Sequence, residues 1–125
     1  MKFLPAMLCG SLLAMATFWI APVQADDQMA ASMCDYIKAD DKNRLRKLLS
    51  DNRLRLRNIY DGIVCNGQNM VRFAVANNAN NVGEFIIKQL PAAQIGSSGD
   101  IAWAEANHAG SGLIEVLKTR AGGGD

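Results

Sequence analysis

The chain has 125 residues, half of them hydrophobic, and its 13 basic and 12 acidic side chains give a formal net charge of +1. This length fits a single domain with a modest core. The balanced charge argues against the strongly basic class of nucleic-acid-binding proteins, so no nucleic-acid partner is expected.

The first 25 residues have the three parts of a secretory signal peptide. Lys2 supplies the positive end, an apolar run extends from Met7 to Ala21, and Val23-Gln24-Ala25 resembles a cleavage site. The apolar run is shorter than the ~20 residues that a spanning helix needs, so an uncleaved anchor is the weaker alternative. We therefore expect residues 1–25 to be removed. The mature chain would start at Asp26, have no stable membrane span, and be periplasmic or secreted.

Two cysteines remain after this processing, Cys34 and Cys65. In an oxidising compartment such a pair is usually a disulfide, and closing a loop of about thirty residues would stabilise the fold by roughly 3 to 4 kcal/mol. The alternative is a pair of buried thiols in the core. Two cysteines and a single histidine without close ligand spacing do not make a zinc site, so no metal or cofactor is expected.

Three stretches of the mature chain share one apolar pattern on either side of a short polar hinge. Residues 33–50 align without a gap on residues 70–87 at a shift of 37, and residues 71–88 align on residues 101–118 at a shift of 30. Apolar residues at i, i+3 and i+4 predict helices, and helices this short need a partner. The sequence therefore predicts an all-α fold, a short array of about three helical hairpins over residues 26–120.

The same alignment predicts which side chains form the core. The second unit supplies five of them and the other two units supply the counterparts: Phe73, Ala76, Val82, Phe85 and Ile86, with Tyr36, Leu45, Leu48, Trp103 and Val116. The hinges, Asp40-Asp41 and Asn77-Asn78, consist of short side chains that favour turns and caps.

The connecting segments carry weaker signals. Residues 51–65 suit either a short extended segment or one helical turn, and both readings stay open. Pro91 ends the preceding helix, and Gly96-Ser97-Ser98-Gly99 is typical of a loop. Residues 121–125 are expected to be a disordered tail because they are mostly glycine.

The stretch Gly67-Gln68-Asn69-Met70-Val71-Arg72-Phe73-Ala74, with Val82 and Ile86-Ile87, resembles an ankyrin repeat in its spacing. That resemblance implies ankyrin-like hairpins. Asn69-Met70 replaces the family's Thr-Pro and Arg72 replaces its His, so the turn signature is missing. The span from Cys34 to Val82 is also similar to a small uncharacterised family of exported bacterial proteins, a domain of unknown function, which implies a compartment and a size but no activity.

Catalytic machinery is not apparent in the sequence. His108 is the only histidine, and it aligns with a hinge, where a surface or capping role is the simplest interpretation. Cys65 and His108 could form a thiol dyad only if Cys65 stayed reduced. No glycine-rich phosphate loop or nucleophile elbow is present. We therefore expect a protein that is not an enzyme, without catalytic residues.

Charge is unevenly placed along the first unit. Residues 26–41 carry five acids and one lysine, whereas residues 42–57 carry one acid and seven cations, Lys42, Arg44, Arg46, Lys47, Arg53, Arg55 and Arg57. Such a run is usually a solvated helix face, but it could also be an anion-binding strip.

Two functions follow from these patterns. The first is a non-enzymatic interaction module that binds another exported or envelope protein through a helical-repeat surface. The alternative is an envelope protein that uses the basic strip to bind an anion, such as a phosphorylated lipid headgroup, a polysaccharide or an acidic partner.

Overall fold

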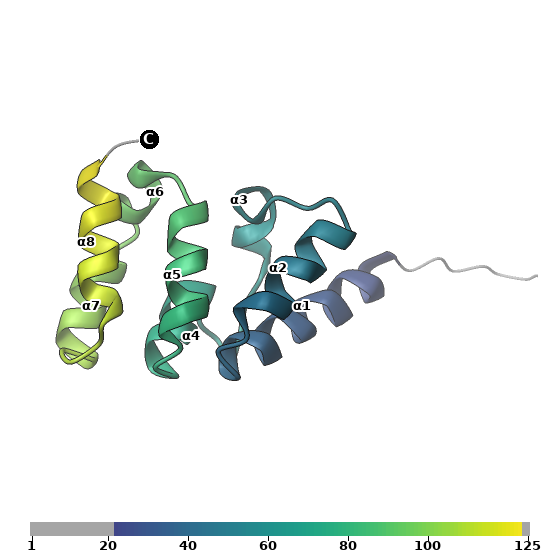
Figure 1. The fold of residues 1–125 in the computed structure, drawn as a ribbon, viewed down its shortest axis with the longest axis horizontal. Coiled ribbons are helices and arrows are strands. Elements are labelled where there is room, and N and C mark those ends of the chain that lie inside the picture. Colours follow the sequence, from purple (N-terminus) through teal and green to yellow (C-terminus); the bar gives the residue numbers. More distant parts are fainter. Residues whose placement is uncertain (1–21, 124–125) are drawn as a thin grey trace, which may run out of the picture.

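The computed structural model describes residues 22–123, with side chains from Asp27 onward, and this part of the chain is helical (Figure 1). Its elements are α1 (Pro22–Lys38), α2 (Lys42–Asp51), α3 (Leu56–Ile59), the 3₁₀-helix η1 (Tyr60–Gly62), α4 (Met70–Ala76), α5 (Asn80–Gln89), α6 (Ala92–Ser97), α7 (Asp100–Asn107) and α8 (Leu113–Gly123). The predicted all-α class is confirmed. The predicted signal peptide lies outside the described residues, apart from residues 22–25 in the first turn of α1.

Three helix pairs stack side by side along the molecule (Figure 1). Within a pair, α1 packs on α2, α4 on α5, and α7 on α8. Between pairs, first helices contact first helices and second helices contact second helices. The helical connector formed by α3 and η1 links the first two pairs, and α6 links the last two while packing on both α7 and α8.

Equivalent residues in the turns of the first two helix pairs are 38 positions apart in the sequence, so the predicted shift of 37 is wrong. The amide of Asp41 donates to the Tyr36 carbonyl at 2.8 Å, and Ala79 donates to Ala74 at 2.9 Å in the same way. Asp40 and Asn78 both have positive φ, at 56° and 54°. Because one residue turns a helix by about 100°, this difference moves the buried face.

The core is therefore built from partly different side chains. Of the predicted set, Leu45, Val82 and Ile86 are buried, whereas the aromatic side chains, Leu48 and Val116 are half-buried against the core. Ala76 is exposed, so that prediction is wrong. Its place on the inward face is taken by Val75, which corresponds to Ile37 in the first pair. The largest fully buried side chains also include Met33, Met70, Leu90, Ile95, Leu113 and Leu117.

The third pair keeps the shift of 30 in its first helix only. The side-chain amide of Asn77 donates to the Phe73 carbonyl at 2.8 Å, and Asn107 donates to Trp103 at 2.9 Å. The second helix, α8, then starts three residues later than this shift requires. The Leu113 side chain fills the space next to Gly83. A Cβ atom at position 83 would overlap with Leu113 Cδ1. Glycine at position 83 thus lets α8 pack closely on α5.

The connector between the first two pairs ends in a two-residue hairpin turn. Of the two readings left open for residues 51–65, the helical turn is the one found, as α3. Cys65 and Gln68 then exchange backbone hydrogen bonds of 2.8 and 2.9 Å around Asn66 and Gly67, both with positive φ. Asn-Gly is a strong signal for this type of turn, and our sequence interpretation did not use it.

Two expectations for the C-terminal part are corrected. The first two residues of the predicted loop at 96–99 belong to α6. The helix α8 continues to Gly123 where a disordered tail was predicted from Ala121 onward. Ala121 is half-buried against the core near Gly96, and this packing supports a helix whose glycines alone would not favour it. Residues 124 and 125 lie outside the described part.

The first pair caps a helix of the second. Ala79, the N-cap residue of α5, has no side chain that could accept a hydrogen bond. Asp40 supplies this acceptor from the preceding turn, because its Oδ1 accepts from the Val82 amide at 2.8 Å and its Oδ2 from the Asn81 side chain at 3.0 Å. The α1–α2 turn therefore helps to fix the start of α5.

Replacing Asp40 with glycine should lower the free energy of unfolding by about 1 kcal/mol, because the capping bonds are lost while the positive φ is relieved. Asn78→Gly is the matched control, since Asn78 has the same backbone conformation in the next turn. Urea denaturation of both variants measures the difference. Equal midpoints would show that the Asp40 carboxylate does not contribute to stability.

Candidate functional site

A basic hollow lies between α2, α5 and the segment that leads into α3. Its volume is about 530 Å³. It is lined by Arg46, Leu49, Ser50, Leu54, Arg55, Leu56, Arg57, Phe85, Lys88 and Gln89.

Three of the seven predicted cations line this hollow together. Arg46 comes from α2, and Arg55 and Arg57 come from the connector at the start of α3. A fourth cation, Lys88, comes from α5, where it pairs with Glu84 at 3.0 Å. Lys88 was not predicted because it lies 31 residues beyond Arg57, and only the packing of α5 beside α2 and α3 brings it here.

The other four predicted cations lie outside the hollow. Arg44 is 3.3 Å from Asp41, and Lys47 is 2.7 Å from Asp51. The hydrogen bond with Asp51 raises the pKa of Lys47 and keeps its ammonium group engaged. Lys42 borders a separate hollow that also has Asp40 and Asp41 in its lining. Arg53 lies in the turn after α2. The predicted strip is therefore not one continuous site.

The floor of the basic hollow is apolar. Leu49 and Leu56 are buried, and Leu54 and Phe85 are half-buried beside the cationic side chains. Residues from the last turns of α2 and α5 also line the hollow, and the carbonyl groups at a helix C-terminus carry partial negative charge. The site thus combines spread positive charge at its rim with apolar surface and weakly negative helix ends.

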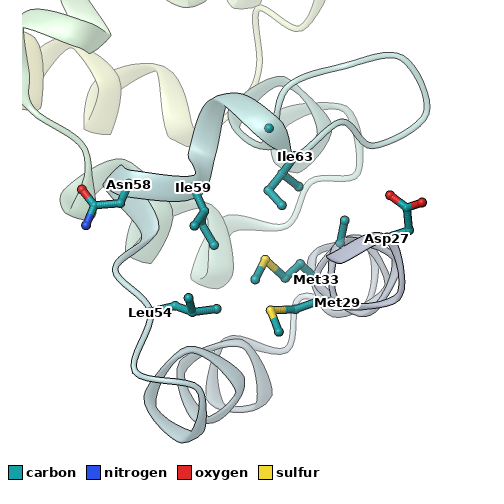
Figure 2. A pocket seen from close by; sticks show the side chains of 9 residues that line it. Asp27, Met29, Met33, Leu54, Asn58, Ile59 and Ile63 are labelled. Carbon is teal, nitrogen blue, oxygen red and sulfur yellow. The ribbon is translucent and has the colours of Figure 1, made fainter. Parts of the chain in front are cut away.

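A second cavity, which we call the methionine cavity, opens between α1 and the α3–η1 connector (Figure 2). Its volume is about 350 Å³. Its lining includes Met29 and Met33 from α1 and Leu54, Ile59 and Ile63 from the connector. Asp27 is the charged side chain of this lining. Leu54 borders both the methionine cavity and the basic hollow.

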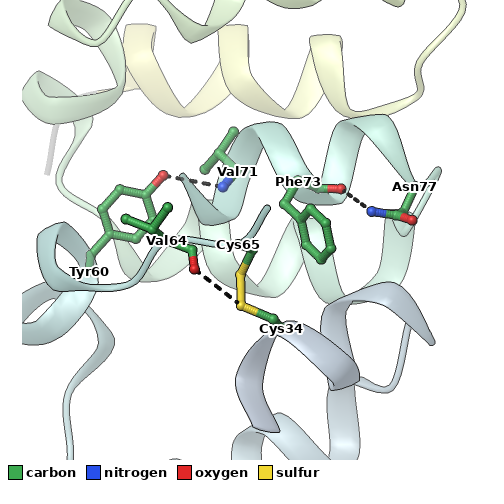
Figure 3. Close-up of a disulfide and its surroundings, with 7 residues drawn as sticks. All are labelled: Cys34, Tyr60, Val64, Cys65, Val71, Phe73 and Asn77. Carbon is green, nitrogen blue, oxygen red and sulfur yellow. Dashed lines mark hydrogen bonds between the residues drawn. A yellow bond between two sulfur atoms is a disulfide. The ribbon is translucent and has the colours of Figure 1, made fainter. Parts of the chain in front are cut away.

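The predicted disulfide is confirmed. Cys34 in α1 is joined to Cys65 before α4, with an S–S distance of 2.02 Å and a Cα–Cα distance of 5.5 Å (Figure 3). The 3.7 Å contact between Cys34 Sγ and the Val64 carbonyl is not a hydrogen bond, because a disulfide sulfur carries no proton. Cys65 has no thiol in this state, so the dyad with His108 cannot operate.

Tyr60 fixes the end of the connector against α4 (Figure 3). The Val71 amide, at the start of α4, donates to the Tyr60 hydroxyl oxygen at 3.2 Å. Burial raises the pKa of Tyr60, so the phenol stays protonated at physiological pH. Together with the disulfide, this hydrogen bond attaches the connector, which lines the basic hollow and the methionine cavity, to α1 and α4.

A buried ion pair joins α4 to α7. Asp100, only 1% exposed, accepts hydrogen bonds from Arg72 Nε at 2.7 Å and from the Asn69 side chain at 3.2 Å. The Arg72 guanidinium lies 5.1 Å from the centre of the Trp103 ring, and the centres of the Trp103 and His108 rings are 5.1 Å apart. These side chains engage one another, which is typical of a structural network. His108 also caps the end of α7 through its backbone amide.

Within residues 22–123, no three His, Cys, Asp or Glu side chains gather in a way that could hold a metal ion. None of the helices in that range is long and apolar enough to cross a membrane.

Comparison with known proteins identifies a family for this chain. The family model described as "Protein of unknown function (DUF3718)" matches residues 33–97, just over half of the chain. The matched range runs from within α1 to the end of α6, so it contains the disulfide and all residues that line the basic hollow. Neither a curated protein nor a solved structure matches the chain.

Proposed function

We propose that this chain, which belongs to the DUF3718 family of unknown function, is an exported, non-enzymatic module that binds an acidic segment of another envelope protein. The basic hollow is the binding site. The observation that supports this proposal is the meeting of Arg46, Arg55, Arg57 and Lys88, from three separate elements, around one apolar floor.

The arginines are suited to carboxylates. A guanidinium group presents a planar fork of donors that matches the two oxygens of a carboxylate. Of the ion pairs within residues 22–123, none involves Arg46, Arg55 or Arg57. Their donors are thus available to a ligand, whereas Arg44 and Lys47 are engaged within α2 and its turns.

The floor of the hollow favours a peptide segment over a compact phosphate group. Leu54 and Phe85 offer apolar contact that a phosphate cannot use. Carboxylates spread along a chain can instead reach the arginines at the rim while their apolar stems cover the floor.

Export is the second part of this proposal. The disulfide supports it, because such bonds persist in oxidising compartments outside the cytosol. The pattern of residues 1–25 supports it independently. The partner is accordingly another periplasmic or secreted protein.

Changing Arg46, Arg55 and Arg57 together to glutamine should weaken binding of a fluorescent hexaglutamate peptide by about fivefold or more, since each exposed ion pair contributes roughly 0.2–1 kcal/mol. Binding to the oxidised protein recovered after export is measured by fluorescence anisotropy at low and high salt, and high salt should weaken it.

The matched control changes Lys42, Arg44 and Arg53 to glutamine, which removes the same charge outside the hollow. Equal losses in the two triple variants would show general charge attraction and contradict a site at the hollow. Binding of anionic lipid vesicles or an acidic polysaccharide in place of the peptide would contradict an acidic protein segment and favour the alternative anions.

A further inference from the structure

Leu54 lines both the methionine cavity and the basic hollow, so the two sites meet at this side chain. We propose that the acidic segment carries an aliphatic side chain beside its acids, and that this side chain enters the methionine cavity. The recognised element is then an aliphatic residue next to carboxylates, lying across the connector at Leu54. This inference rests on the proposed function, because it describes the same ligand more closely.

The cavity has the character of a side-chain pocket. Met33 and Ile63 are buried and form its floor, while Met29 and Ile59 are half-buried at its walls (Figure 2). Its volume of about 350 Å³ lies at the low end of the range of roughly 300–1,000 Å³ for ligand pockets. Methionine side chains adapt to the shape of an apolar group. A short aliphatic group therefore fits it better than a long acyl chain.

Charge sets the direction in which the segment lies. Asp27 lines the methionine cavity and repels carboxylates there. Arg55 and Arg57, just beyond Leu54 in the chain, attract carboxylates to the basic hollow. The aliphatic end consequently lies against α1, and the acidic end lies over α2 and α5.

Continuity between the two sites is the reason for assigning them one ligand. Both are walled by the connector of residues 54–63, which the Cys34–Cys65 disulfide and the Tyr60 hydroxyl fix to the helix pairs. A ligand held by the arginines places its neighbouring residues next to Leu54, so the second contact is made within the same molecule.

The test compares three synthetic peptides on the oxidised protein recovered after export. The first is hexaglutamate, the second has two leucines and a glycine added before the glutamates, and the third has serines in place of the leucines. The leucine peptide should bind about tenfold more tightly than the serine peptide, since burying an aliphatic side chain supplies the difference.

Two variants localise this leucine advantage. Ile59→Gln and Met29→Gln each place a polar group in the cavity wall and should remove the advantage without changing hexaglutamate binding. The Met29 variant, on α1, covers the case in which the Ile59 variant fails to fold. Val64→Gln is the control, because Val64 is 61% exposed and does not line the cavity. Asp27→Asn should leave the leucine advantage in place, because it keeps the apolar lining of the cavity.

The outcomes separate this inference from the proposed function. If hexaglutamate binds and the leucines add nothing, or if Val64→Gln removes their effect as fully as the cavity variants do, the inference is wrong and the proposed function stands. If no acidic peptide binds, the proposed function fails and the inference fails with it.

Discussion

Changing Arg72 to methionine is expected to cost about 3 kcal/mol or more of the free energy of unfolding, because it leaves a buried carboxylate without its cation. Asp100 is almost fully buried and depends on Arg72 Nε and the Asn69 amide for its hydrogen bonds. The Arg72 variant also loses the contact of the guanidinium with the Trp103 ring. Urea denaturation gives the loss directly.

The pair should respond unequally to removal of its two members. The Arg72 side chain is 30% exposed, so water can solvate it when Asp100 is changed to asparagine. Asp100→Asn should therefore cost less, about 1–2 kcal/mol, because a hydrogen bond is weakened but no buried charge is left unpaired. Changing Arg72 to methionine and Asp100 to leucine together should recover much of the loss. Equal costs for the two single variants would contradict this account of the ion pair.

Loss of the disulfide is expected to cost about 3.5 kcal/mol by the chain-entropy estimate. The two cysteines are 31 residues apart in sequence, so the bond restricts a long loop of the unfolded chain. That cost is a large part of the roughly 5–15 kcal/mol that stabilises a typical domain. Guanidinium denaturation with and without reductant measures it.

The double variant Cys34→Ala/Cys65→Ala is the control for the covalent bond itself. It should match the reduced wild type to within about 1 kcal/mol, since only small packing terms differ. Thiol titration of the exported protein under denaturing, non-reducing conditions should find no free thiol. Two titratable thiols would show that the cysteines are small core residues in the exported protein, contrary to the structure.

The helices and the bridge could be predicted from the sequence because their causes are local or compositional. Apolar spacing around Val82 and Ile86 is enough for a helix, and export of a chain with two cysteines is enough to expect a bond. The shift between the first two pairs could not be fixed in this way. Matching Tyr36 to Phe73 gives an aromatic pair at 37 residues, but the residue with positive φ in each turn, Asp40 or Asn78, sets the true shift of 38.

The candidate site was only partly predictable for a different reason. Arg55 and Arg57 could be recognised as cations, but a run of charges does not show which of them share a hollow. The packing of α5 brings Lys88 to the basic hollow. Lys47 does not line the hollow and is engaged in an ion pair with Asp51. The pairing of Arg72 with Asp100 likewise depends on α4 and α7 lying side by side. Such groupings are tertiary, and a single sequence does not contain them.

The bond between Cys34 and Cys65 also bears on how the protein withstands proteases. Arg53, Arg55 and Arg57 are exposed to trypsin-like proteases and lie inside the covalent loop that this bond closes. A single cut after any of them leaves the two fragments joined through the sulfurs, with Tyr60 still bonded to α4. This arginine-rich segment can therefore be nicked without release of the first helix pair.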